Sequence, residues 1–265
     1  MKVFAAMYDR IKWLLFPGIN LHARLRYHLL PRYFLPPPNG TDSLVLDAGC
    51  GNGMLTYQAY LKGHVALGIS IKEGEVSRNR RLFNHLLGIP ESRLSFAVHN
   101  LYELESLGLQ FDQIICSEVL EHIARDAELC RIFWRVLKAG GVLHLCCPNA
   151  DHPDNANSPL DPCERGGHVR PGYTELSYRE LLEPIGFQLT EVIGLGGPLR
   201  QWCNKALTLA QKIGGIWLGT ALFFVLGPLA SLDTRRPRVP YSLYVRAIKP
   251  HTKTEAIETW CGAQP

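Results

Sequence analysis

The chain has 265 residues, of which 46% are hydrophobic and 20% charged, and its formal net charge is +4. This length suits one full-sized domain with an elaboration rather than two independent domains. The basic residues are dispersed, so the charge gives no indication of a nucleic-acid partner. The eight cysteines include no Cys-x-x-Cys pair, and Asp9, Arg10 and Lys12 interrupt any signal-peptide-like apolar stretch. We therefore expect a reduced, cytoplasmic setting.

Strands and helices are predicted to alternate along most of the chain. Residues 1–40 form an expected N-terminal helical cap, which the proline run at residues 36–38 ends. The predicted strands cover residues 43–47, 65–70, 94–99, 111–117, 141–147, 187–194 and 241–248, and the predicted helices cover residues 53–62, 73–87, 124–138 and 175–184. Such alternation is typical of a doubly wound α/β sheet. Residues 251–265 are expected to be a flexible tail.

A glycine-rich loop follows the first predicted strand, in the run Leu44-Val-Leu-Asp-Ala-Gly-Cys-Gly-Asn-Gly53. The continuously apolar start suits a strand covered on both faces of a parallel sheet. Gly49, Gly51 and Gly53 allow a sharp turn and close approach of the backbone to a ligand. Asp47 would repel a pyrophosphate but would accept hydrogen bonds from an ammonium or a hydroxyl group. The loop therefore favours a nucleoside cofactor that carries a cationic amino acid.

These residues resemble the first motif of class I methyltransferases that use S-adenosylmethionine. Four further segments resemble later motifs of that family in the family's order, namely residues 66–71, 95–101, 111–118 and 137–144. The resemblance spans roughly residues 40–195 and implies S-adenosylmethionine as the cofactor. It also implies a Rossmann-like three-layer α/β/α domain over residues 41–250, with a seven-stranded, mostly parallel sheet and an antiparallel last strand.

The resemblance assigns cofactor contacts residue by residue. They are Asp47, Gly49, Cys50, Gly51 and Gly53 in the loop, Ser70 and Ile71 after the second strand, Asn100 and Leu101 after the third, and Ser117 after the fourth. Ser70 occupies the position at which the family usually has an acid that binds the ribose hydroxyls. Lipid-modifying relatives of the cyclopropane synthase kind also have a hydroxyl residue at this position. Asn100 replaces the aspartate that faces the adenine amino group, and the alternative is a strand-ending turn asparagine.

A cluster of acids and a histidine follows the fourth strand. If a helix begins there, Glu118, Glu121 and His122 share one face at i, i+3 and i+4, which suits Mg²⁺, Mn²⁺, Zn²⁺ or Fe²⁺. The pattern resembles the metal-binding helix of O-methyltransferases of ubiquinone biosynthesis and of small-RNA ends, which implies His168 as a further ligand. Glu118, His122 and His168 are the candidate catalytic residues. Two alternatives stay open: His122 or His168 as a metal-free base, and a cluster that only caps a helix and lines the cofactor.

Two segments depart from the family pattern. Residues 148–173 are polar, too long for an ordinary connection, and expected to frame the acceptor site. An apolar helical insertion at residues 198–238 contains no charged residue from 213 to 230, a length that meets the threshold for a membrane-spanning helix. The flanking strands belong to one sheet, so a single crossing is excluded. Two alternatives remain, a buried cap over the active site and a hairpin that dips into a membrane. Basic residues border such a hairpin at Lys205, Lys212, Arg235, Arg236 and Arg238.

The expected function is methyl transfer from S-adenosylmethionine, with oxygen of a hydrophobic or amphipathic small molecule as the acceptor. A quinone-like aromatic, an isoprenoid or polyketide, or a lipid-linked sugar fits the apolar insertion. Carbon or nitrogen methylation of a lipid or natural product is the alternative, and a non-catalytic cofactor-binding scaffold is a second one. RNA is a minority interpretation, because a basic patch with interleaved aromatics is lacking. Peripheral contact with the cytoplasmic face of a membrane would run through residues 213–230, and the sequence leaves the oligomeric state open.

Overall fold

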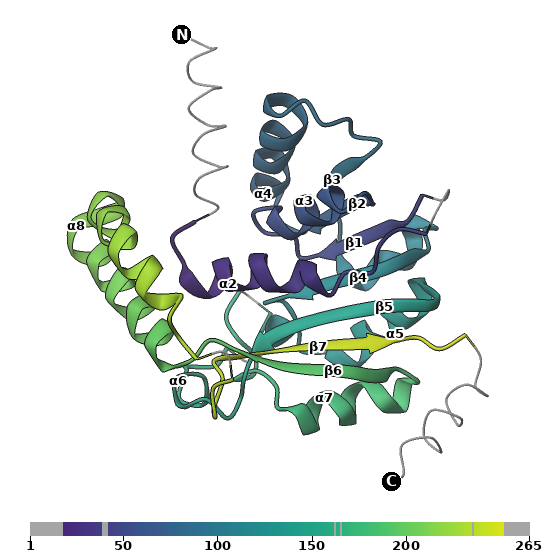
Figure 1. The fold of residues 1–265 in the computed structure, drawn as a ribbon. Helices are drawn as coiled ribbons and strands as arrows, with labels where there is room; N and C mark the ends of the chain where they lie inside the picture. The colour runs from purple at the N-terminus through teal and green to yellow at the C-terminus, as the bar shows by residue number, and fades with distance from the viewer. Residues whose placement is uncertain (1–17, 39–41, 162, 165, 235, 252–265) are drawn as a thin grey trace.

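A seven-stranded sheet forms the centre of the protein. The computed structural model describes residues 18–38, 42–161, 163–164, 166–234 and 236–251. The strand order is β3-β2-β1-β4-β5-β7-β6; β7 pairs antiparallel with β5 and β6, and the other pairs are parallel (Figure 1). The strands are β1 Leu44–Ala48, β2 Val65–Ser70, β3 Leu94–Val98, β4 Phe111–Ser117, β5 Leu137–Pro148, β6 Gln188–Leu195 and β7 Ser242–Ile248. The predicted mostly parallel sheet with an antiparallel last strand is confirmed.

Helices cover both faces of this sheet, as Figure 1 shows. One face carries α2 Leu21–Leu29, its extension η1 Leu30–Arg32, α3 Met54–Leu61, α4 Glu73–Asn79 and the π-helical continuation η2 Arg80–Leu86. The other face carries η3 Leu101–Leu107, α5 Asp126–Val136, α7 Glu175–Leu182 and its continuation η5 Glu183–Ile185. Two short pieces, η4 Leu120–His122 and α6 Pro153–Ala156, lie in the connections that follow β4 and β5. This three-layer arrangement is the doubly wound fold that the alternation of elements predicts.

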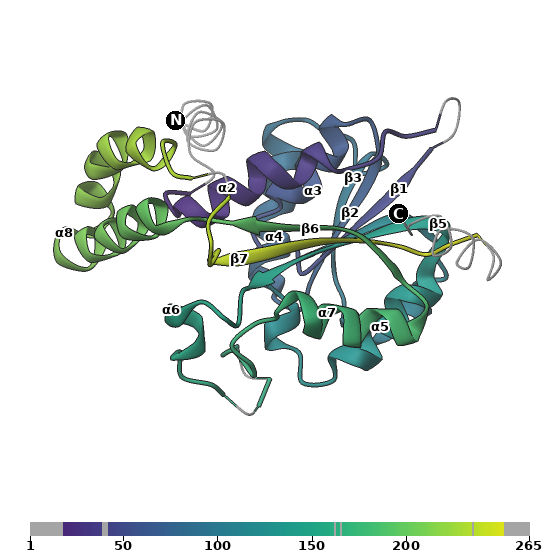
Figure 2. The same ribbon diagram turned by 60° about the horizontal axis from the view of Figure 1, so that its bottom comes forward.

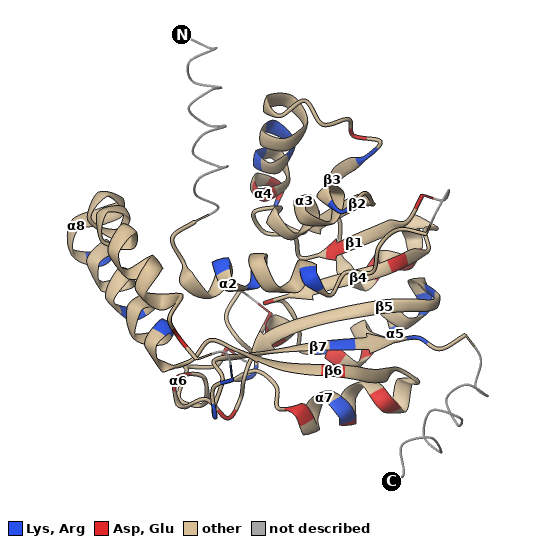
Figure 3. Ribbon diagram, in the orientation of Figure 1, with Lys and Arg blue, Asp and Glu red and all other residues tan. Residues whose placement is uncertain are grey.

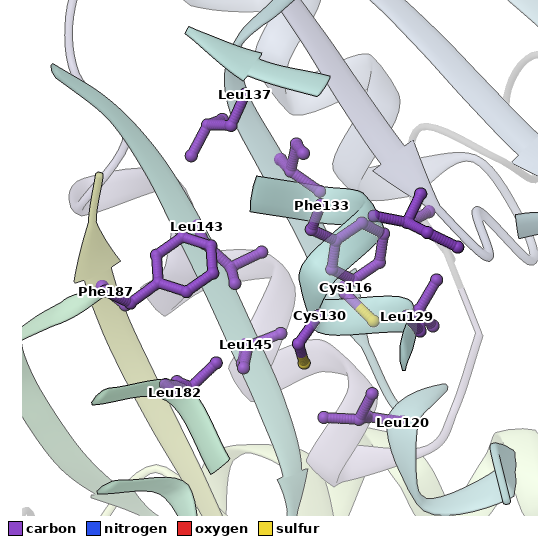
Figure 4. Packing of buried hydrophobic residues seen from close by; sticks show 14 of the residues in the cluster. Cys116, Leu120, Leu129, Cys130, Phe133, Leu137, Leu143, Leu145, Leu182 and Phe187 are labelled. Carbon is purple, nitrogen blue, oxygen red and sulfur yellow. The ribbon is translucent and has the colours of Figure 1, made fainter. Parts of the chain in front are cut away.

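A separate hydrophobic core lies on each face of the sheet. In β1, Val45 belongs to the core beneath α3 and α4, and its neighbour Leu46 belongs to the core beneath α5 and α7. Both side chains are buried, because successive residues of a strand point to opposite faces. Figure 4 shows part of the second core, where Phe133 of α5, Leu143 of β5 and Phe187 come together. The continuously apolar strand in the sequence thus reflects burial on both sides.

One strand is longer than its sequence predicts. β5 begins at Leu137 rather than at residue 141, because Leu137 already pairs with Phe111 of β4. The pairing then shifts register before Val142, and Gly140 takes the left-handed φ of +76°. The helix predicted over residues 124–138 accordingly ends at Val136. Gly140 and Gly141 lie inside this strand. The sequence does not predict its early part, because glycines are typical of turns as well as of β-bulges.

The apolar insertion forms a helical hairpin. Helix α8 covers Pro198–Ala230 but breaks at Gly214 and Gly215, where the φ of Gly215 is +67°. Figure 2 shows the two arms turned back on each other beyond the ends of β6 and β7. The arms pack on each other and on α2 through a small third core of Leu21, Cys203, Leu207, Phe223, Leu226 and Ala230. Glycine without a Cβ permits the left-handed conformation that reverses the chain.

The hairpin is neither a buried cap nor a membrane-spanning helix. α8 is long and apolar enough for a span by length and composition, with a mean hydropathy of 1.8 in its most apolar stretch. Each arm alone is shorter than the ~20 residues that a spanning helix needs. In that apolar stretch 17% of the residues are buried, so the buried-cap alternative is wrong. The first 17 residues of the expected N-terminal cap and the expected tail beyond residue 251 lie outside the described residues.

Candidate active site

The predicted cofactor residues gather at the carboxyl edge of the parallel strands. β1 lies between β2 and β4, where the strand order reverses, and open α/β sheets bind ligands at such a point. The glycine loop is anchored there because the amides of Gly49 and Cys50 both donate to the carbonyl of Ile69, at 2.9 and 2.8 Å. The loop therefore stays fixed against the end of β2.

The three loop glycines differ in what surrounds them. Their φ values of +80°, +50° and +75° at Gly49, Gly51 and Gly53 all lie in the left-handed region. A Cβ on Gly49 would lie 2.3 Å from Val119, and one on Gly53 would lie 2.8 Å from Phe83. A Cβ on Gly51 would meet no atom of the described residues within 4 Å. Gly49 and Gly53 thus serve packing, whereas Gly51 opens a space in which a ligand can approach the backbone.

Asp47 is a buried acid at the end of β1, with 2% of its surface exposed. The hydroxyl of Thr56 in α3 donates to its Oδ2 at 2.6 Å. Burial raises the pKa of Asp47 to about 6, against the effect of the Thr56 hydrogen bonds. A carboxylate in this condition is stabilised by a cationic group placed beside it, as an ammonium would be.

A second acid lies at the end of β2, which the sequence pattern did not indicate. Ser70 donates its hydroxyl to Oε2 of Glu75 at 2.8 Å and accepts from the amide of Lys72 at 3.1 Å. Glu75 also lies close enough to the glycine loop to raise the pKa of the Cys50 thiol, after burial and Asp47. α4 therefore supplies the carboxylate that the strand itself lacks. The only sequence signal is the acidic first turn of that helix.

The remaining predicted cofactor residues lie around the same edge. Ile71 follows β2 with 70% of its surface exposed, Leu101 is buried at the start of η3, and Ser117 ends β4. Asn100 is exposed, and its side-chain oxygen accepts from the amide of Tyr102 at 3.1 Å. This hydrogen bond caps η3, as expected for the turn alternative, while the oxygen keeps a second lone pair.

The prediction of a helix that aligns Glu118, Glu121 and His122 is wrong. Glu118 has a φ of +56°, the one left-handed non-glycine among the described residues, and only Leu120–His122 forms a short 3₁₀ turn. The amide of Glu118 donates to the carbonyl of Cys146 at 2.7 Å, which holds this conformation. Its carboxylate lies 3.5 Å from the guanidinium of Arg26 in α2 rather than beside Glu121 and His122 in one ligand set. Strained residues of this kind concentrate at functional sites.

Glu121, His122 and His168 do come together. One ligand atom of each lies within 4.8 Å of the others, and the two imidazole rings meet edge to face at 4.7 Å. Nδ1 of His122 lies 2.8 Å from the carbonyl of Gly167, which can only accept, so Nδ1 carries the proton. The lone pair of Nε2 is then free on the side of Glu121, whose Oε1 lies 4.0 Å away. A carbonyl partner of this kind orients histidines that bind metals.

The loop that carries His168 is held against the segment that follows β4 and against the start of α5. The amide of Val169 donates to the carbonyl of Glu121 at 2.9 Å. Arg170 forms an ion pair with Asp126 and donates to the carbonyl of Ile123 at 2.8 Å. The Tyr173 hydroxyl donates to the same Asp126 carboxylate at 2.7 Å. Arg170 and Tyr173 thus position His168 without contacting it.

The charge of Glu121 has little compensation. The residue is completely buried, and its carboxylate oxygens accept no regular hydrogen bond from the described residues. Burial first, and then the charge of Glu118, raise its pKa to about 8, although the Cys147 thiol and its own backbone amide act in the opposite direction. Burial and His122 lower the pKa of His168. A cation among the three side chains would stabilise the ionised carboxylate beside neutral imidazoles.

Comparison with known proteins decides the family. Residues 20–192, more than half of the chain, match the sequence profile of the family described as "Methyltransferase domain". The chain belongs to the class I S-adenosylmethionine-dependent methyltransferases. The cofactor of this family is S-adenosylmethionine. The glycine loop and Asp47 lie at the carboxyl edge of the sheet, where Ser70 also contacts Glu75.

The chain resembles known proteins over about half of their length. It is 31% identical over 57% of its own chain to the Probable S-adenosylmethionine-dependent methyltransferase of Mycolicibacterium smegmatis, and 27% identical over 57% to the mitochondrial Ubiquinone biosynthesis O-methyltransferase of Mus musculus. These matches span 54% and 43% of the two relatives. The solved structure of magnesium protoporphyrin IX methyltransferase from Synechocystis, with bound S-adenosylmethionine, has a TM-score of 0.55 at 16% identity and covers 86% of this chain and 80% of its own. That similarity shows the fold alone.

The open space at Gly51 leads to a matched prediction for this methyltransferase. Gly51→Ala and Gly108→Ala both place a Cβ where no atom of the part of the chain that the structure describes lies within 4 Å, at φ values of +50° and +63°. We expect each to lower the free energy of unfolding by about 1–2 kcal/mol, because both force alanine into the left-handed region. Only Gly51→Ala should also weaken S-adenosylmethionine binding, by at least ~10-fold in calorimetry. Equal affinity in the two variants would show that the cofactor does not use this space.

Proposed function

We propose that the protein transfers the methyl group of S-adenosylmethionine to a hydroxyl oxygen of a hydrophobic or amphipathic small molecule. The observation that carries this proposal is the cluster of Glu121, His122 and His168, whose first two members follow Val119 in the connection after β4. Gly49 of the loop packs on Val119, two residues before Glu121, so the cluster borders the cofactor edge. A hydroxyl acceptor must lose its proton during transfer. The imidazoles of this cluster can accept that proton, or the cluster can bind a metal ion that lowers the pKa of the hydroxyl.

The residues of the cofactor edge fit S-adenosylmethionine. The buried acid Asp47 would face the ammonium group of the cofactor. The Ser70–Glu75 pair would face its ribose hydroxyls. The space at Gly51 would let the cofactor approach the backbone of the loop. The cofactor supplies an electrophilic methyl group on a sulfonium. The chain contributes mainly position, because in-line displacement depends on the alignment of donor and acceptor, which is worth up to ~7–11 kcal/mol in favourable cases.

The cluster fits a divalent metal ion through Glu121, His122 and His168, and Glu118 is not part of the set. Such an ion needs ligand atoms with available lone pairs. Glu121 offers two buried carboxylate oxygens without regular hydrogen bonds from the described residues. His122 offers Nε2, because its Nδ1 donates to the carbonyl of Gly167. A set of one carboxylate and two imidazoles favours Zn²⁺, Fe²⁺ or Mn²⁺ over Mg²⁺, which prefers oxygen ligands. When bound, the ion lowers the pKa of a coordinated hydroxyl. Without it, His168, whose pKa burial lowers, or His122 would serve as the base.

Oxygen as the acceptor atom has support from the relatives. The matches include ubiquinone biosynthesis O-methyltransferases, among them one from Pseudomonas putida at 27% identity. The oxygen ligand and two imidazoles beside the cofactor edge suit activation of a hydroxyl. The apolar hairpin at the same edge of the sheet favours a hydrophobic or amphipathic acceptor.

The proposal is tested by incubating the purified protein and labelled S-adenosylmethionine with cell extract and identifying the metabolite that gains the methyl group by mass spectrometry. We expect a product labelled on oxygen. A product labelled on carbon or nitrogen would contradict the proposed acceptor atom, and cofactor binding without any product would contradict turnover. The metal is tested separately by exhaustive chelation, which should abolish transfer until Zn²⁺, Fe²⁺ or Mn²⁺ is restored. Transfer that survives chelation would leave the metal-free base.

A further inference from the structure

The α8 hairpin presents large apolar side chains to solvent. The first arm exposes Trp202, Leu209 and Ile213, which lie on one face of the helix at i, i+7 and i+11. The turn and the second arm expose Ile216, Trp217, Leu218, Val225 and, just beyond the helix, Leu232. Ile213 and Trp217, which flank the glycine turn, are 74% and 80% exposed. Apolar surface of this extent and continuity marks an interaction site rather than ordinary surface variation.

The two helices that form this surface carry positive charge. α8 contains Arg200, Lys205 and Lys212, α2 beside it contains Arg24, and neither helix contains Asp or Glu. Lys205 forms an ion pair with Asp154 of α6 at 2.7 Å. Figure 3 shows these basic positions along α2 and α8. The nearby Asp233 is occupied at the start of α8, where it accepts from the amides of Gly197 and Leu199 at 2.7 and 3.3 Å. An apolar tip with basic flanks is complementary to an anionic lipid surface.

A cavity between α2 and the hairpin adds a headgroup-sized space. Its volume is about 310 Å³, and its lining combines apolar side chains with three basic ones. The basic residues are Arg24, His28 and Arg200, and the guanidinium of Arg24 lies 4.9 Å from the centre of the Phe223 ring. Burial lowers the pKa of all three, and at Arg200 the nearby Asp233 and Cys203 oppose this shift. The two guanidinium groups stay charged at neutral pH, and His28 adds a ring N–H donor, so the site suits a phosphate that carries acyl chains.

We propose that the α8 hairpin docks the protein on an anionic phospholipid membrane, with its tip in the interfacial layer and a lipid phosphate between Arg24, His28 and Arg200. Tryptophan at the tip suits this layer, where one part of the side chain is apolar and the other wet. The hairpin begins and ends at the carboxyl edge of the sheet, so docking places the candidate active site next to the bilayer. The inference does not depend on which acceptor atom is methylated.

Sedimentation of the full chain with vesicles tests this proposal. We expect binding to vesicles of phosphatidylcholine mixed with phosphatidylglycerol, little binding to phosphatidylcholine alone, and weakening with salt. Ile213→Glu with Trp217→Glu should reduce binding at least tenfold. Leu176→Glu, at an exposed leucine of α7 on the body of the domain, is the matched control and should bind normally. The affinity for S-adenosylmethionine, measured without vesicles, should stay unchanged in all of these variants.

The cavity is tested by Arg24→Gln, which should lower the preference for phosphatidylglycerol several-fold, against Arg131→Gln on the exposed side of α5 as a control. Equal binding of the tip variant and the wild type would overturn the docking surface. Equal binding to both vesicle types would overturn the headgroup site. If the tip variant instead dissociates a dimer that forms without vesicles, the apolar surface covers a second copy and the membrane proposal fails.

Discussion

His122→Ala is expected to lower the rate constant of methyl transfer by roughly 10²–10⁴-fold, which is the range for loss of a positioned acid–base or ion-holding group. The affinity for S-adenosylmethionine should change little, because His122 contacts Gly167 and His168 rather than the glycine loop. Single-turnover measurement of labelled product, combined with calorimetric binding, separates the two effects. His85→Ala, at an exposed histidine of η2, is the control that should leave the rate unchanged.

Glu121→Gln adds a second test of the cluster, because we expect it to slow methyl transfer and to stabilise the metal-free protein. Burial raises the pKa of Glu121 to about 8 in the metal-free protein, so near neutral pH this carboxyl must take up a proton when the chain folds. Glutamine avoids that cost, so the metal-free variant should be more stable by about 1–3 kcal/mol at pH 7. Methyl transfer and the metal content measured by elemental analysis should both fall. Normal transfer in both variants would show that the cluster only caps the turn after β4.

Asp47→Asn is expected to weaken S-adenosylmethionine binding by about 10–100-fold, because a hydrogen bond to a charged group contributes about 1.5–3 kcal/mol. The amide keeps the size of the side chain and its acceptor for the Thr56 hydroxyl, so the fold should be preserved. Calorimetric titration gives the affinity. Wild-type affinity in the variant would mean that the ammonium of the cofactor does not face this acid.

The same variant should change the pH dependence of stability. The pKa of Asp47 is raised from 3.8 to about 6 in the folded protein, so the folded state holds the proton more tightly than the unfolded state. The wild-type free energy of unfolding should therefore decrease as the pH rises from about 4 to about 6, by roughly 3 kcal/mol at most for this group. Asp47→Asn should lack this decrease. Urea unfolding at pH 4, 5, 6 and 7 compares the two proteins, and parallel curves would contradict the burial of the charge.

The sheet was predictable because its signals are local. Strands such as β1 and β4 are continuously apolar, and each is followed by turn residues, so their bounds differ from the predicted ones by no more than a residue. The cofactor loop is also recognised locally, because its three glycines adopt the left-handed backbone conformation that other residues avoid. The early start of β5 was not predictable, because Leu137 is in a strand only through its pairing with Phe111 on a neighbouring strand.

The candidate site was only partly predictable. Glu121 and His122 are neighbours in sequence, and the family resemblance supplied His168, which the structure places beside them. Glu118 was assigned to the wrong partner, because its left-handed backbone directs it toward Arg26. Glu75 was missed, because its role depends on the approach of α4 to the end of β2.

The amino-acid sequence by itself determined the family, the cofactor edge and the alternation of strands and helices, because each depends on residues that are close together in the chain. Only the tertiary structure decided which acids face the cofactor edge, which side chains form the three-residue cluster, and that the apolar insertion is an exposed hairpin. The physical reason is that burial is a property of the packed chain. Residues 213–230 are apolar in either case, but the hairpin formed at Gly214 and Gly215 buries Phe223 and Leu226 between its arms and leaves Ile213, Trp217 and Val225 exposed.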